Sequence, residues 1–102
     1  MLEEFNDITL NSSRWFEVDI TKNANQKGLK TFIYLKKAVQ VNDIFKIKRH
    51  SDVKYYVKQF IKLSNNGDYT YEIKRFDGNN ITQVDLDRIL KDRKIKIKGH
   101  LN

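Results

Sequence analysis

Apolar and polar residues alternate along much of the chain, and this period of two predicts β-strands. The clearest case is segment 53–63, in which one parity is mostly apolar: Val53, Tyr55, Val57, Ile61 and Leu63. The opposite parity alternates lysines with aromatic rings: Lys54, Tyr56, Lys58, Phe60 and Lys62. The solvent side of a strand needs polar groups but does not need rings, so this second set is the first candidate for a binding surface.

Five further segments carry the pattern of strands: 15–20, 29–37, 39–48, 69–76 and 94–98. Segment 31–35 is apolar on both parities, which predicts a central strand covered on both faces. Trp15 opens an apolar strand and is therefore assigned to the core. In 94–98 isoleucines alternate with lysines, which is typical of a closing edge strand that lysines protect from aggregation. The polar segment 21–28 is predicted to be a loop or hairpin connection.

The long strand is expected to pair with segment 69–76 through a five-residue loop. In that register Leu63 lies opposite Tyr69 and Ile61 lies opposite Tyr71, so one face is continuously apolar. A two-residue loop would shift the pairing and place apolar side chains opposite polar ones. The favoured register also groups three rings with four lysines on the outer face: Tyr56, Phe60 and Phe76 with Lys54, Lys58, Lys62 and Lys74.

A helix is predicted over residues 82–93. Thr82 has the side chain of an N-cap, and Asp85 three residues later completes a capping box. Leu86, Ile89 and Leu90 then form an apolar stripe, with charged residues on the other side.

Together these elements predict a mostly β (α+β) domain that occupies residues 1–102. It consists of an acidic N-terminal arm (1–13), antiparallel strands (14–76), a helix (82–93) and a closing edge strand (94–98). The expected architecture is a small barrel or a strongly curved antiparallel sheet of five to six strands, with one helix in the C-terminal region.

Charge adds an asymmetry to this picture. The net charge is +7, but residues 1–20 carry −4 and the remainder carries +11. A basic body is expected of a protein that meets a polyanion, although a small soluble domain can carry a similar charge without such a partner. The chain is rich in Lys, Asn and Ile, whose codons are AT-rich, and this suggests a low-GC bacterium, or a phage or mobile element living in one, as its source.

Candidate chemistry argues against an enzyme. The chain has no cysteine, which excludes disulfides and thiolate metal sites. His50 and His100 do not stand in the spacing of metal ligands or of an acid–base pair. No phosphate-binding loop, dinucleotide fingerprint or nucleophile elbow is found, so no cofactor is predicted. No apolar run reaches membrane-spanning length and no secretion signal is recognised, so we expect a cytoplasmic protein without a membrane partner.

The basic and aromatic residues support a first hypothesis, which is binding of nucleic acid. Rings can stack on bases while lysines neutralise phosphates, so backbone-dominated binding with a preference for single strands is expected. The predicted contact residues are Lys54, Tyr56, Lys58, Phe60, Lys62, Lys74 and Phe76, with Lys94, Lys96 and Lys98 as flanking charge.

Two alternatives stay open at this point. The helix could pack over Tyr56, Phe60 and Phe76, which would make these rings part of the core and the lysines its rim. In function, the chain could instead be a phage or mobile-element adaptor or inhibitor that docks on the acidic surface of a host or particle protein. The oligomeric state is not predicted.

Overall fold

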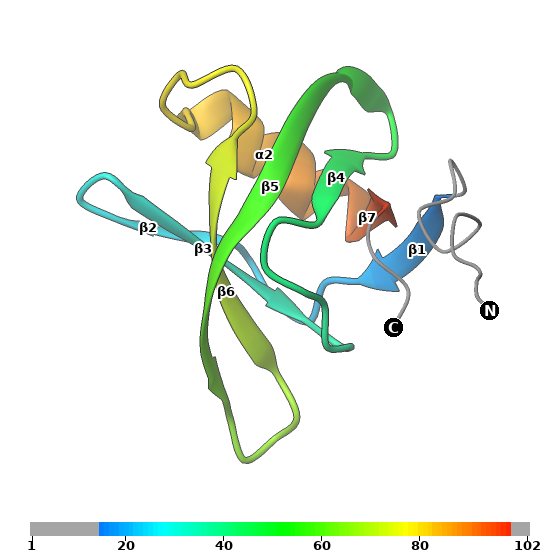
Figure 1. The fold of residues 1–102 in the computed structure, drawn as a ribbon, viewed down its shortest axis with the longest axis vertical. Coiled ribbons are helices and arrows are strands. Elements are labelled where there is room, and N and C mark those ends of the chain that lie inside the picture. Colours follow the sequence, from blue (N-terminus) through cyan, green and yellow to red (C-terminus); the bar gives the residue numbers. More distant parts are fainter. Residues whose placement is uncertain (1–14, 99–102) are drawn as a thin grey trace, which may run out of the picture.

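The structure is a computed structural model that describes residues 15–98, so the predicted acidic arm lies outside the described residues. It contains seven strands and one helix (Figure 1). The elements are β1 (Phe16–Asp19), β2 (Asn25–Lys27), β3 (Lys30–Leu35), β4 (Ile44–Ile47), β5 (His50–Leu63), β6 (Tyr69–Arg75), α2 (Gln83–Asp92) and β7 (Lys94–Lys98). The predicted class, mostly β with one helix near the C-terminus, is confirmed.

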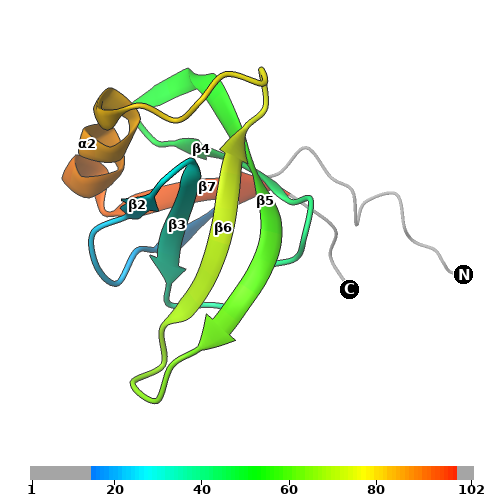
Figure 2. The ribbon, with the colours of Figure 1, turned by 90° about the vertical axis from the view of Figure 1, so that its left-hand side faces the viewer.

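All seven strands form one antiparallel sheet in the order β1-β7-β4-β5-β6-β3-β2. The sheet curls strongly (Figure 2) but does not close into a barrel. The two ends of the sheet approach each other just after β1, where an isolated bridge joins Ile20 to Leu35 of β3. The backbone N–H of Thr21 donates to the carbonyl of Tyr34 at 2.9 Å beside this bridge. Of the two predicted forms, the curved sheet is therefore the one found.

The strand count was underestimated because β2 is short and polar. It lies within segment 21–28, which was predicted only as a connection. Lys27 pairs with Lys30, so Gly28 and Leu29 form a two-residue hairpin loop. Gly28 has a φ of 65°, which glycine adopts without steric cost and which this kind of tight turn requires at its first position.

The prediction that 94–98 is an edge strand is wrong, although its bounds are correct. β7 pairs with β1 on one side and with β4 on the other. Its alternating lysines indicate a solvent-facing side of the sheet, and this feature was misread as protection of an unpaired edge. The outermost strands are β1 and β2.

The β5–β6 register agrees with the prediction only near the loop. Leu63 pairs with Tyr69 and Lys62 pairs with Thr70, as expected. Two irregularities follow in β5, one between Phe60 and Lys62 and one between Val57 and Gln59. Each inserts one extra residue into β5, so the pairing predicted for the rest of this strand is shifted.

The core fills the inside of the curved sheet. Phe45 and Tyr55 stack there at a centroid distance of 5.3 Å, and Ile89 of α2 is fully buried against the sheet. The buried apolar residues are Val18, Ile20, Ile33, Leu35, Phe45, Ile47, Tyr55, Val57, Tyr71, Ile73, Ile81, Ile89, Ile95 and Ile97. Phe32 and Tyr34 on the other face of β3 are only half-buried, so the second covering layer expected for this strand is not found.

The predicted helix is confirmed, with Thr82 as its N-cap and Arg93 as its C-cap. Asp85 accepts hydrogen bonds from the backbone N–H of Thr82 at 2.7 Å and from the Tyr55 hydroxyl at 2.6 Å. Arg75 of β6 lies 3.4 Å from the same carboxylate. Asp85 therefore fixes α2 to the inner side of β5 and β6.

Candidate nucleic-acid interface

The cross-strand register places three lysines side by side on the outer face of the sheet. Lys46 of β4 pairs with Lys54 of β5 on one side and with Lys96 of β7 on the other. Directly paired residues project from the same face at a separation of about 5 Å. Like charges in this arrangement repel one another. Lys96 pairs in turn with Glu17 of β1, where the row ends.

A second row crosses the same strands and brings in aromatic rings. It runs from Lys74 of β6 through Tyr56 and Ile44 to Lys98 of β7. The ring of Phe76 meets that of Tyr56 edge-on at a centroid distance of 6.5 Å. Phe76 is 62% exposed, so much of its side chain is accessible to a ligand.

Trp15 lies over these two rows and is not part of the core, contrary to the prediction. The ammonium of Lys46 lies 4.3 Å from its ring centroid, and that of Lys98 lies at 5.6 Å. These are cation–π distances. The sequence contained a signal for this position, because Trp15 has the same parity as the charged Glu17 and Asp19 in the strand pattern.

We call the resulting surface the basic face. Its residues are Trp15, Lys46, Lys54, Tyr56, Lys74, Phe76, Lys96 and Lys98. The prediction missed Lys46, which joins the lysine of β5 to that of β7, because the pairing of β4 with β7 is non-local. Within residues 15–98, no acidic side chain forms an ion pair with Lys46, Lys74, Lys96 or Lys98.

The helix does not cover this surface. Its buried residues, Asp85 and Ile89, face the core on the inner side of the sheet. Figure 2 shows α2 at the left of the molecule and β5 at the right. The alternative in which Tyr56, Phe60 and Phe76 form a floor under the helix is therefore wrong.

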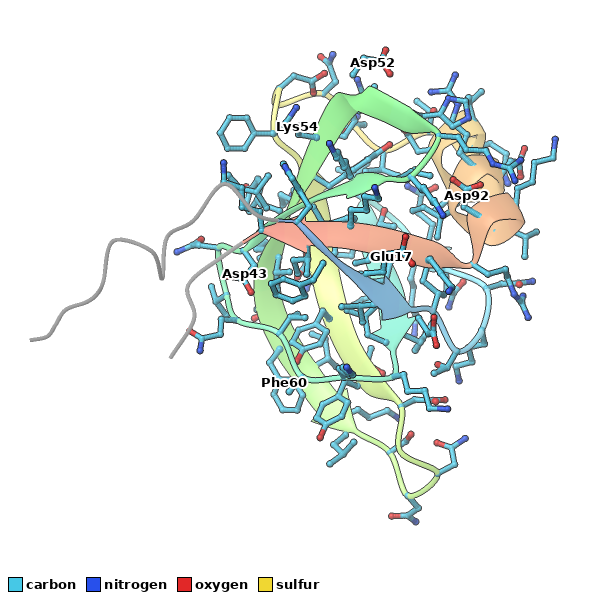
Figure 3. All side chains as sticks on the ribbon, turned by 90° about the vertical axis from the view of Figure 1, so that its right-hand side faces the viewer. Glu17, Asp43, Asp52, Lys54, Phe60 and Asp92 are labelled. Atoms are coloured by element: carbon cyan, nitrogen blue, oxygen red, sulfur yellow. The ribbon has the colours of Figure 1, made fainter. Side chains whose placement is uncertain are left out.

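Three of the predicted contact residues lie away from the basic face. Phe60 pairs with Tyr71 and lies on the same face of the sheet as Tyr71, with the two ring centroids 5.5 Å apart. Figure 3 shows Lys54 and Phe60 near opposite ends of β5. Lys58 lies 3.7 Å from the buried carboxylate of Glu72. Lys62 comes directly after the bulge that follows Phe60. The two bulges interrupt the alternation on which the prediction of one continuous face depended.

Lys94 shares the outer side of β7 but lies at an acidic margin. Its ammonium is 3.6 Å from Glu17 and 3.8 Å from Asp19. Lys48 lies 3.4 Å from the other oxygen of Glu17. The hydrogen bond and charge of Lys48, with weaker effects of Lys94 and Lys96, hold the pKa of Glu17 below its ordinary value. At this margin Glu17 and Asp19 offset the charges of Lys48 and Lys94.

Other kinds of site find no support in residues 15–98. No group of three or more His, Asp or Glu side chains in this region is placed to hold a metal ion. The helix described there is not long and apolar enough to cross a membrane. Comparisons with protein-family models, curated proteins and solved structures gave no match.

Proposed function

We propose that this protein is a non-enzymatic nucleic-acid-binding domain that holds the phosphate backbone and prefers single strands. The observation that carries the proposal is the row of Lys54, Lys46 and Lys96, which meet across three neighbouring strands. Their mutual repulsion is relieved when phosphates take up position between them. A polyanion is thus the partner that this arrangement fits best.

The rings support a single strand over a duplex. Exposed aromatic side chains next to lysines offer stacking platforms to unpaired bases, each contributing about 1–3 kcal/mol. Phe76 and Tyr56 hold this position beside Lys74. The helix, by contrast, lies on the other side of the sheet, so it is not placed to enter a major groove alongside the basic face.

An acidic protein surface is the alternative partner, and one feature of β5 favours it. Phe60, Ile61 and Leu63 are between 40% and 51% exposed near the β5–β6 loop. Exposed apolar side chains next to basic residues are suited to anchoring in a partner protein. This partner would need both the basic face and the loop end of β5, whereas a bare oligonucleotide would not need Leu63.

The test is fluorescence anisotropy of labelled single- and double-stranded oligonucleotides at two salt concentrations. Each phosphate contact on a single strand contributes about 0.7 to the slope of log affinity against log salt. Lys46→Gln with Lys96→Gln should therefore reduce this slope by about 1.4 and weaken binding roughly 25-fold at 0.1 M salt.

The matched control is Lys37→Gln with Lys91→Gln, which removes the same charge from exposed positions outside the basic face. This control should bind nearly as tightly as the wild type. Equal losses in both double variants would mean that only the net charge matters, and the proposal would be wrong. Absence of binding at low salt would also reject it and would direct the search to an acidic protein.

A further inference from the structure

A groove lies on the outer side of the sheet at the loop end of β5, away from the basic face. Its lining includes two aromatic rings of β3 and three lysines: Phe32, Tyr34, Lys22, Lys27 and Lys62. Ile61, the extra residue of one β5 bulge, is 40% exposed at its rim. The groove therefore repeats the combination of rings and lysines found on the basic face.

The cross-strand register places these groups together. Tyr34 pairs with Thr70, and Thr70 pairs with Lys62, so the three side chains form one row. The ammonium of Lys22 lies 4.4 Å from the ring centroid of Tyr34. Asp68 is 4.0 Å from Lys22, but its side chain is only 11% exposed. The groove thus presents mainly positive charge to a ligand.

The outer side of β6 connects the groove with the basic face. Thr70, Glu72 and Lys74 follow one another at every second position, and Lys74 belongs to the basic face. Glu72 between them is 1% exposed, and its carboxylate is close to Lys58. The charge of Lys58 therefore offsets that of Glu72 between the two basic regions.

We infer that the groove is a second contact for the same single strand, in which Lys22 moves from the Tyr34 ring to a phosphate, bases stack on Phe32 and Tyr34, and Lys62 neutralises a second phosphate. This inference rests on the proposed function. From β4 to β3 the path crosses three strand spacings and runs four residues along β6, a distance on the order of 20 Å. At about 3.4 Å per stacked nucleotide, a strand must be roughly six nucleotides long to reach both contacts.

The experiment measures the affinity of unstructured thymidine oligomers of four and twelve nucleotides by anisotropy. In the wild type the longer oligomer should bind much more tightly, because only it reaches both contacts. Lys22→Gln with Lys62→Gln should weaken binding of the twelve-nucleotide oligomer roughly 25-fold at 0.1 M salt, since each lost phosphate contact is worth about fivefold. The advantage of the longer oligomer should largely disappear.

The two double variants then distinguish the contribution of the basic face from that of the groove. Lys46→Gln with Lys96→Gln should weaken binding of both oligomers, whereas the groove variant should act mainly on the longer one. If the groove variant binds the twelve-nucleotide oligomer like the wild type, or weakens both oligomers equally, the inference is overturned while the proposed function stands. If the wild-type protein binds neither oligomer, both fail.

Discussion

The carboxylate of Asp85 offers the sharpest test of how the helix is attached to the sheet. It is 1% exposed and accepts hydrogen bonds from the Tyr55 hydroxyl and the Thr82 backbone N–H, with Arg75 3.4 Å away. Asp85→Ala would leave all three partners without their common acceptor. Burial, with the hydrogen bond to Asp85 as a second cause, raises the pKa of Tyr55 above its ordinary value, so its hydroxyl stays protonated as a donor at neutral pH.

The expected cost follows from these contacts. Arg75 keeps its ion pair with Asp77 at 2.6 Å, so the main loss is the set of hydrogen bonds to the buried Asp85 carboxylate, each worth about 1.5–3 kcal/mol. Loss of an N-terminal capping interaction costs about 1 kcal/mol by itself. Both effects come from one carboxylate and overlap, so we expect Asp85→Ala to lower the free energy of unfolding by about 2–4 kcal/mol. A domain of this size is stable by only about 5–15 kcal/mol, so the loss is a large fraction.

Urea unfolding followed by circular dichroism measures this change. The matched control is Asp87→Ala on the exposed side of the same helix, where the carboxylate accepts a hydrogen bond only from Gln83, among the contacts described. Surface changes of this kind alter stability by about 0.5 kcal/mol or less. Tyr55→Phe removes a single hydroxyl and should cost about 1–2 kcal/mol. A loss below about 1 kcal/mol for Asp85→Ala would refute the assignment of this carboxylate as the link between helix and sheet.

Two further outcomes concern the same region of the molecule. Burial alone would raise the pKa of Asp85, but hydrogen bonds from Thr82 and Tyr55 and the charge of Arg75 hold it below its ordinary value. A carboxyl group with a lowered pKa in the folded state contributes stability above its unfolded pKa of about 3.9, and this stability is lost as the pH falls through the folded value. When the pH is lowered from 6, the free energy of unfolding of the wild type should therefore begin to decrease at about pH 4, and it should decrease less in Asp85→Asn. An equal pH dependence in the two proteins would contradict this. At the helix C-cap, Arg93 has a φ of 58°, which glycine adopts at a lower steric cost. Arg93→Gly should therefore raise the free energy of unfolding, measured by thermal unfolding, by about 0.5–1 kcal/mol. No gain would argue against the left-handed cap.

Local signals predicted much of the fold. The helix was found because a capping residue, an acidic N3 position and an apolar stripe all lie within a dozen residues. The register next to the β5–β6 loop was predicted correctly because the loop length and the alternation of apolar residues determine which residues pair close to the loop. These interactions are short in sequence, so one sequence contains enough information to identify them.

The bulges of β5 were harder to recognise, and they account for most of the misplaced contact residues. An extra residue changes the parity of everything beyond it, so Phe60 lies beside Tyr71 and not beside Lys58. One signal was available, since Gln59 interrupts the apolar parity of the strand. It did not show where the pairing shifts, because a bulge is defined by its partner strand.

The composition of the basic face is itself an argument that the surface is a contact and not merely a solvated side of the sheet. Solvation needs polar groups, and mixed charges would supply them without repulsion, as Glu17 and Asp19 do next to Lys94. The centre of the face instead sets Lys46 between two other lysines and covers it with the ring of Trp15. Neither choice stabilises the core, because all these side chains lie outside it. The cation–π contact with Trp15 offsets part of the repulsion between the lysines, and phosphates along the row would offset more of it, which is the reason that we propose a polyanionic partner.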